Sequence, residues 1–230
     1  AGEPGSRVIH PASPFATGLQ AVSGVLLLYT LVTAPLLLSF WNYPDPCETA
    51  PTLYFDIIVD SFFIIEIVLN FFIGAEVNGV YVDSVPAIAL KYVGSPSLFW
   101  FDVFTSIPLS WIDWGVAQSC LDGSVSPVSS NLTFIRAVKP LRFLKMSRLL
   151  KLIRFVRDVA EQFRVRPGQR KITVLLLTLA AAMHIFACAF WRVKHESMSE
   201  EQVQEFLNSK AVTEGLIDAY VTCLYFICTI

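Results

Sequence analysis

Charged residues are scarce in this chain of 230 residues. Asp, Glu, Lys and Arg together make up 16% of the sequence, whereas soluble domains average about 25%. None of the four occurs from Val8 to Pro44, and an apolar run longer than about 18 residues indicates a transmembrane helix. This scarcity excludes a disordered chain and argues against an ordinary soluble domain, so we expect an integral membrane protein.

Patterns typical of enzymes and metal sites are also missing from the sequence. The three histidines are scattered, and no phosphate-binding loop, CxxC pair or nucleophile–base arrangement stands out. We therefore expect no enzymatic activity, no metal site and no cofactor within the chain. The basic residues are interleaved with Leu, Ile, Phe and Val, which does not suit nucleic-acid binding, and we expect no nucleic-acid partner.

Apolar stretches separated by polar ones predict five membrane-spanning helices and one shorter helix. Pro108 should break the third span, and the last stretch is short enough to re-enter the membrane rather than cross it. Because the sequence does not begin with Met and stops within an apolar stretch, we expect a piece of a longer protein. The predicted helices are 19–41, 53–75, 98–114, 132–158, 172–191 and 214–230, with a polar loop at 76–96.

The basic residues also predict the orientation in the membrane. The linker 159–171 contains four Lys and Arg residues, and an excess of such residues marks cytoplasmic loops. Alternation then places the N-terminal region 1–18 and the 76–96 loop in the cytoplasm. The remaining loops, 42–52, 115–131 and 192–213, would lie outside.

Basic residues follow a strict period of three in the fourth segment. Twelve of the 17 Lys and Arg residues lie between positions 136 and 171, and eight of them are spaced three apart with mostly apolar residues between them. An α-helix would arrange these eight as a spiral, and a 3₁₀-helix would align them. This pattern is typical of the moving segment of a voltage sensor; a calmodulin-binding or surface-lying helix is the alternative. We call these residues the basic ladder: Arg136, Lys139, Arg142, Lys145, Arg148, Lys151, Arg154 and Arg157.

Carboxylates in the second and third segments are the expected partners of the basic ladder. Asp56, Asp60, Phe63 and Glu66 share one face of a helix, and Asp102 is a further acid within the third span. An unpaired carboxylate in hydrocarbon is costly, so we expect ion pairs with the ladder. A static ion-paired bundle is the alternative, but it does not explain why the bases outnumber the acids on a regular ladder.

The second segment resembles a known family. Its pattern Asp-x3-Asp-x2-Phe-x2-Glu, continued by Asn70 and Phe71, is similar to that of the ether-à-go-go, hyperpolarization-activated and cyclic-nucleotide-gated channel superfamily, which includes plant-type potassium channels. Further matches support the resemblance over nearly the whole chain: Ile9-His10-Pro11, Tyr92, Ser95, Trp100-Phe101-Asp102, Ser106-Ile107-Pro108, His184, Ala187-Cys188, Trp191 and the Tyr220–Phe226 stretch.

The resemblance implies an all-α membrane protein with a four-helix voltage-sensor bundle at 19–158. A fifth transmembrane helix and a re-entrant pore helix would form a truncated pore domain at 172–230. It further implies that Phe63 is the aromatic plug of a charge-transfer centre. Glu66 and Asp102 would lie on its cytoplasmic side, and Asp56 and Asp60 on its outer side.

The function implied by the resemblance is that of a pore-forming subunit of a tetrameric voltage-gated cation channel in the plasma membrane. Three further copies or related subunits, and membrane lipid, would be the partners. Potassium is the expected permeant ion, at a filter beyond Ile230. One alternative is a non-selective cation channel gated by voltage, by a cyclic nucleotide at a C-terminal domain outside this chain, or by both. Another is a transporter or enzyme that carries a voltage-sensor domain.

Two extracellular features are expected. Cys47 and Cys120 both fall in predicted outer loops, where they form either a disulfide or two free thiols. Asn131 begins an Asn-Leu-Thr acceptor sequence for N-glycosylation. The other three cysteines, Cys188, Cys223 and Cys228, lie in apolar stretches and are expected to be buried.

Overall fold

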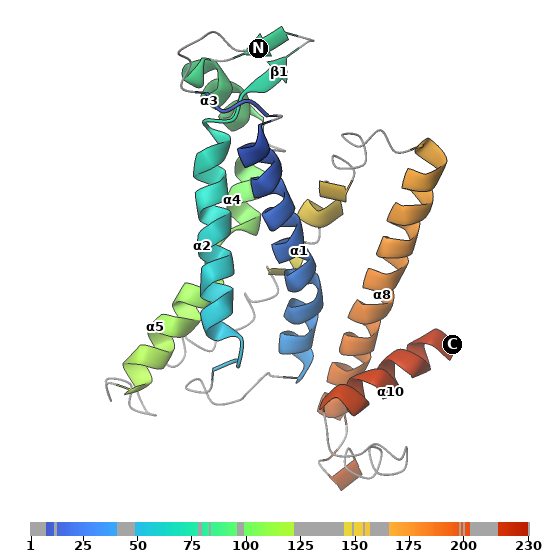
Figure 1. Cartoon of the computed structure of the whole chain (residues 1–230). Helices are drawn as coiled ribbons and strands as arrows, with labels where there is room; N and C mark the ends of the chain where they lie inside the picture. Colours follow the sequence, from blue (N-terminus) through green and yellow to red (C-terminus); the bar gives the residue numbers. More distant parts are fainter. Residues whose placement is uncertain are drawn as a thin grey trace. The chain divides into compact units, whose positions relative to one another are not determined.

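The protein is mostly helical and divides into two compact units, which we describe separately (Figure 1). The first unit comprises residues 1–28 and 45–151, and the second comprises residues 29–44 and 152–230. The structure is a computed structural model. It describes residues 8–11, 13–40, 49–77, 80–82, 84–95, 99–121, 145–148, 150–153, 155–156, 166–197, 199, 201–202 and 216–229.

Helix α1 (Pro14–Phe40) begins before the predicted first span, because the sequence provides a helix start there. The hydroxyl of Ser13 accepts a hydrogen bond from the amide of Ala16 at 3.2 Å, as an N-cap residue does. Pro14 follows at the first helical position, where its missing N–H costs nothing. A second proline, Pro35, lies inside the helix.

Helix α2 (Leu53–Asn70) is polar inside and apolar outside. Its buried residues include three carboxylates, whereas large aliphatic side chains such as Ile58, Ile65 and Val68 are exposed. This is the opposite of a helix in a soluble protein. It suits a helix whose outer surface faces lipid and whose polar face is buried in a bundle.

The segment after α2 is structured rather than the polar loop expected at 76–96. Strands β1 (Ala75–Val77) and β2 (Val80–Val82) form an antiparallel hairpin, and helix α3 (Val85–Gly94) follows. The sequence contains Asn-Gly between the two strands, which is a strong hairpin signal. Ile9, ahead of α1, forms a parallel bridge with Ile73 and ties the start of the chain to this region.

The third segment consists of two helices instead of one. Helix α4 (Phe101–Thr105) ends before Pro108, and helix α5 (Leu109–Leu121) begins directly after it. The break lies where proline was expected to interrupt the span. Helix α5 continues seven residues past the predicted end at Trp114. Both α4 and α5 pack against α2 in the first unit.

The fourth segment is described only in its second half. Residues 145–147 form a 3₁₀ turn, and the described positions that follow, 148, 150–153 and 155–156, are α-helical. The ladder residues Arg136, Lys139, Arg142, Arg154 and Arg157 lie outside the described residues, as do Cys47 and Asn131.

The second unit is built on two packed helices, α8 (Pro167–Ser197) and α10 (Leu216–Thr229). Helix α8 is longer than the predicted span 172–191 at both ends, and proline occupies its first position as in α1. The core between the two helices contains Ala187 and Trp191 of α8 and Ala219 and Cys223 of α10. Phe40 of α1, which belongs to this unit, stacks on Trp191 with ring centroids 5.2 Å apart.

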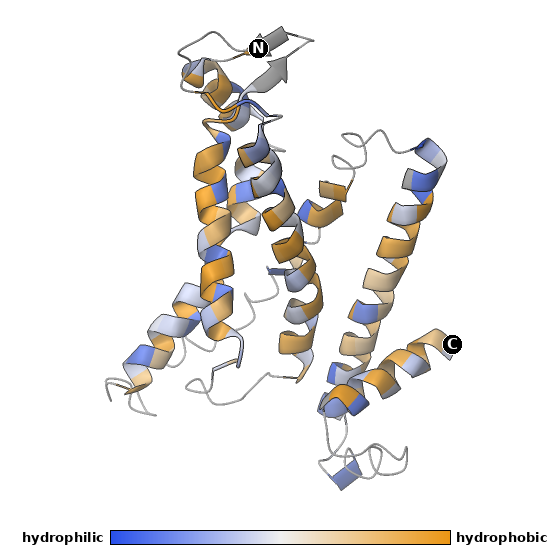
Figure 2. Ribbon diagram, in the orientation of Figure 1, coloured by the Kyte–Doolittle hydropathy of each residue, from blue (hydrophilic) through white to orange (hydrophobic). Residues whose placement is uncertain are grey.

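Large apolar side chains are exposed on most helices. The ribbon coloured by hydropathy shows how much of α1, α2 and α8 is apolar (Figure 2). Within the described part of the chain, α1 and α8 are long and apolar enough to cross a membrane. Helix α2 carries three carboxylates in its 18 residues, so composition alone does not identify it as a span. Large exposed apolar areas are rare on soluble monomers, and those on α1, α2 and α8 fit a chain surrounded by lipid.

Candidate functional site

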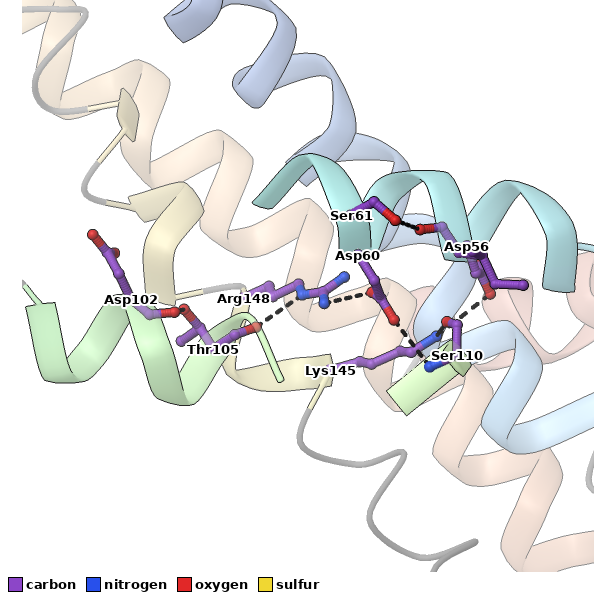
Figure 3. Close-up of polar contacts among 9 residues, drawn as sticks. Asp56, Asp60, Ser61, Asp102, Thr105, Ser110, Lys145 and Arg148 are labelled. Carbon is purple, nitrogen blue, oxygen red and sulfur yellow. Dashed lines mark hydrogen bonds and ion pairs between the residues drawn. The ribbon is translucent and has the colours of Figure 1, made fainter. Parts of the chain in front are cut away.

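Three successive residues of the basic ladder meet the carboxylates of the second and third segments inside the first unit. Each cation has its own acidic partner, and most of the groups involved are buried. Figure 3 shows the part of this network around α2, α4 and α5. The residues brought together are Lys145, Arg148, Lys151, Asp56, Asp60, Phe63, Glu66 and Asp102.

Lys145 occupies the first of three cation positions. Its Nζ donates to the hydroxyl of Ser110 at 2.7 Å and lies 3.5 Å from Asp56 Oδ2. The hydroxyl of Thr52 also donates to Asp56, at 3.3 Å. This position therefore holds an ammonium group between a hydroxyl and a carboxylate.

Arg148 occupies the second position and is the most deeply buried of the three cations. Its Nη2 donates to Asp60 Oδ1 at 2.6 Å, and the two side chains are 3% and 0% exposed. Its Nε donates to the carbonyl oxygen of Thr105 at 2.9 Å. The other oxygen of Asp60 accepts the backbone amide of Ser110, also at 2.9 Å. A buried charge is tolerated only when it is paired and hydrogen-bonded, and both partners meet that requirement.

The break at Pro108 makes these backbone contacts available. In a continuous helix the carbonyl of Thr105 would accept from the amide of Leu109, but that amide donates to Ile107 instead. Ser110 lies in the first turn of α5, where backbone amides have no intrahelical acceptor. The interruption thus frees one acceptor for Arg148 and one donor for the carboxylate that pairs with it.

Phe63 separates the second cation position from the third. Its side chain is 1% exposed. The guanidinium carbon of Arg148 and the ammonium nitrogen of Lys151 both lie 4.9 Å from the centroid of its ring, within the range of a cation–π contact. A buried apolar ring thus lies in contact with both cations, and its π-face attracts each of them.

Lys151 occupies the third position, where two acids converge. Its Nζ lies 2.5 Å from Glu66 Oε2 and 3.8 Å from Asp102 Oδ1. Asp102 also accepts a hydrogen bond from the hydroxyl of Tyr92 at 2.7 Å. Tyr92 comes from α3, so this helix contributes directly to the third position.

The hydroxyl of Tyr92 is held as a donor by its surroundings. Burial raises the pKa of Tyr92 far above its ordinary value, and the Asp102 carboxylate adds to the shift, although the Asn70 amide opposes it. The phenol is therefore protonated at any physiological pH. Its ring packs edge-on against Phe71 and Phe99 at 5.1 and 5.5 Å, which fixes the direction of the hydroxyl.

Sequence patterns indicated the charged members of this network but not Thr105, Ser110 or the contact of Tyr92. Thr105 contributes its backbone carbonyl, and Ser110 contributes its backbone amide as well as its hydroxyl. Backbone groups leave no mark in the residue pattern. Pro108 was the available signal, since a broken helix must expose unpaired carbonyls and amides.

Four of the five cysteines lie within the described residues. Cys120 is disulfide-bonded, and Cys188, Cys223 and Cys228 are free. The predicted pairing of Cys120 with Cys47 stays a prediction. Cys188 and Cys223 are buried as expected, whereas Cys228 is exposed. Across the described residues, no group of three or more His, Cys, Asp and Glu could hold a metal ion.

A separate polar contact joins the helices of the second unit. His184 on α8 lies with Nε2 3.0 Å from the carbonyl oxygen of Val32 and with Nδ1 2.7 Å from the hydroxyl of Tyr220 on α10. A carbonyl only accepts, so Nε2 carries a proton, and in the neutral form of the ring Nδ1 then accepts from Tyr220. His184 thereby fixes α10 against α8 and the second-unit part of α1.

The comparisons with known proteins agree with one another and indicate a family of ion transport proteins. The ion transport protein family matches residues 19–230. The voltage-gated inwardly rectifying potassium channel KCNH6 of Gallus gallus is 25% identical over 240 residues, covering 93% of this chain and 18% of that protein. The potassium/sodium hyperpolarization-activated cyclic nucleotide-gated channels 4 and 3 of Homo sapiens are 29% identical over 123 residues and 30% over 112 residues, covering 53% and 47% of this chain and 10% and 14% of those proteins. The chain thus spans less than a fifth of the length of these relatives. It belongs to the ion transport protein family, within the superfamily of voltage-gated cation channels.

Proposed function

We propose that this chain is the voltage-sensing and pore-forming part of a subunit of a voltage-gated cation channel. Family membership confirms that it is not an enzyme and that it belongs to an integral membrane protein. One observation carries the proposal. Lys145, Arg148 and Lys151 each contact a separate carboxylate, and Phe63 lies between the last two of them.

The spacing of the ladder makes such a site suitable for transfer of charge. The cations recur every three residues, so a shift of the fourth segment by one rung puts each cation where its neighbour was. The total number of ion pairs is then unchanged, which keeps the cost of movement low in a buried, low-dielectric place. Phe63 would keep water on the two sides apart while the charges pass.

The membrane potential supplies enough energy for this movement. One elementary charge crossing 100 mV gains about 2.3 kcal/mol. Three charges per subunit would gain about 7 kcal/mol by the same relation, which is enough to reverse an equilibrium between two packed states. A static ion-paired bundle would not respond to voltage in this way.

Gating-current recording from the full-length protein tests the proposal. The wild type should show a transient charge movement with voltage, and Arg148→Gln should reduce the total charge and displace its midpoint. Lys91→Gln is the matched control, because it removes a basic residue that is exposed on α3, outside the ladder. Equal gating charge in wild type and Arg148→Gln would contradict the sensor function.

We further propose that α8 and α10 belong to the pore. One fifth span and one re-entrant helix cannot enclose an ion path, whereas four copies around an axis can. The assembly is therefore a tetramer of this chain or of related subunits, surrounded by lipid in the plasma membrane. The N-terminal region and the linker 159–171 face the cytoplasm. Four-fold cross-linking products of the full-length protein would support the tetramer, and products that stop at two copies would contradict it.

Potassium is the proposed permeant ion. The name of the Gallus gallus relative specifies potassium, whereas the names of the human relatives specify potassium and sodium. Those latter names favour a mixed potassium and sodium pore as the second candidate. The reversal potential with potassium on one side and sodium on the other separates the two. A cyclic nucleotide would act through residues outside 1–230, and its addition to excised patches of the full-length protein tests that role.

A further inference from the structure

Two backbone groups at the junction of α4 and α5 complete the surroundings of Arg148. The carbonyl of Thr105 accepts from its Nε at 2.9 Å, while Asp60 accepts from its Nη2 at 2.6 Å. The amide of Ser110 donates to the second oxygen of Asp60 and so keeps that carboxylate oriented. We call Asp60, the carbonyl of Thr105 and the amide of Ser110 the break site, since the interruption at Pro108 creates it.

The break site presents acceptors that an arginine can reach simultaneously. Asp60 comes from α2 and the Thr105 carbonyl from the end of α4. A guanidinium group donates to them from two different nitrogens, whose relative positions are fixed. A lysine has a single nitrogen on a flexible stem, so it would have to reach both acceptors from one point instead of donating to each from a separate nitrogen. The guanidinium carbon of Arg148 also lies 4.9 Å from the centroid of the Phe63 ring, and a planar cation can stack on an aromatic face.

The positions on either side of the break site hold lysines in a different way. Lys145 binds the hydroxyl of Ser110, and Lys151 binds Glu66 at 2.5 Å. Each contact uses one nitrogen pointed at side-chain oxygens, which is what an ammonium group requires. The three positions therefore differ in the cation that they suit: lysine, arginine, lysine.

The sequence of the ladder follows the same alternation. Its first seven rungs alternate between Arg and Lys, so identical residues are six positions apart. A shift by one rung would put Lys145 or Lys151 in the break site and arginines on both sides of it. A shift by two rungs would return an arginine, Arg142 or Arg154, to the break site.

We propose that the break site selects arginine over lysine, so that the fourth segment rests at every second rung and crosses the intervening rungs without stopping. This inference rests on the proposed function, because it requires the ladder to move past Phe63. Replacing a paired guanidinium by an ammonium group forfeits a charge-assisted hydrogen bond at a buried position. Such a loss changes an equilibrium constant by about tenfold or more.

Charge-conserving substitutions in the full-length protein test the selection by gating-current recording. Arg148→Lys should leave the total gating charge unchanged and reduce the occupancy of the observed position by about tenfold or more, which displaces the midpoint of the charge–voltage curve. Lys145→Arg should stabilise the position one rung away from the observed one, because an arginine would then reach the break site after a single step. The charge–voltage curve should gain a second component. Lys91→Arg on α3 is the matched control and should reproduce the wild-type curve.

The outcomes separate this inference from the proposed function. If charge moves with voltage and both ladder variants coincide with the Lys91→Arg control, the break site does not discriminate and the inference is wrong, while the sensor function stands. If the wild type moves no charge, the proposed function itself fails. Should Arg148→Lys not reach the membrane, Lys145→Arg decides alone, because it leaves Arg148 and the break site in place.

Discussion

Asp60→Asn should destabilise the first unit strongly, because it leaves the guanidinium of Arg148 buried without its counter-charge. The pair is separated by 2.6 Å, and its side chains are 0% and 3% exposed. Removing one partner of a buried ion pair costs about 3–5 kcal/mol. Asparagine has nearly the same volume as aspartate, so the loss reflects charge and hydrogen bonding rather than packing.

A second substitution should restore most of that stability. In the double variant Asp60→Asn with Arg148→Gln, no uncompensated charge remains, and replacing a whole buried pair is often close to neutral. The exposed pair of Arg192 and Glu196 on α8 supplies the control. Glu196→Gln should cost less than about 1 kcal/mol, as exposed ion pairs do.

The assay is denaturant unfolding of the purified full-length protein in detergent micelles, with the free energy of unfolding compared among the four forms. The expected order places Asp60→Asn lowest, the double variant well above it, and Glu196→Gln next to the wild type. If Asp60→Asn lowered the free energy of unfolding no more than Glu196→Gln, the ion pair with Arg148 would not stabilise the buried guanidinium. If the double variant were no more stable than Asp60→Asn, the cost would not come from an unpaired guanidinium.

Three further results are expected. Phe63→Ala should open a leak for small cations through the sensor, because it removes the buried apolar ring that contacts both Arg148 and Lys151. Recordings with the pore blocked would show the leak, and an unchanged leak and gating charge would reduce Phe63 to a packing residue. Tyr92→Phe removes only a hydroxyl, and it should shift the gating midpoint in the same direction as Asp102→Asn, with no further shift in the double variant; additive shifts would mean that the two residues act separately. Mass spectrometry without reduction should find Cys47 linked to Cys120, and a Cys47 alkylated in full would reject that pairing.

The charged members of the site could be predicted because they follow a helical period. Asp56, Asp60 and Glu66 occupy one face of α2 by spacing alone, and a carboxylate in an apolar segment must find a cation. The ladder supplied those cations with a period of three. Both patterns lie in the side chains, so the sequence displays them directly.

Other parts of the structure have no signal in the side-chain pattern, and one part had a signal that was not used in the prediction. Thr105 acts through its backbone carbonyl and Ser110 partly through its backbone amide, and no residue type reports a free carbonyl or amide. Pro108 predicted a break but not the partners that the break would serve. The sequence Asn78-Gly79 is a local signal for the hairpin. The prediction of a loop at 76–96 followed the polar composition of the segment instead. The contact of Tyr92 with Asp102 depends on how α3 packs, and helix packing has no short sequence signature.

The central claim is that the basic ladder moves past Phe63, and cysteine accessibility tests it most directly. In the full-length protein carrying Lys145→Cys, a membrane-impermeant thiol reagent is applied from either side at two opposite voltages. The wild type, with its free Cys188, Cys223 and Cys228, gives the background. Our account predicts that position 145 reacts from one side at one voltage and from the other side at the opposite voltage. Reaction from the same side at both voltages would contradict it.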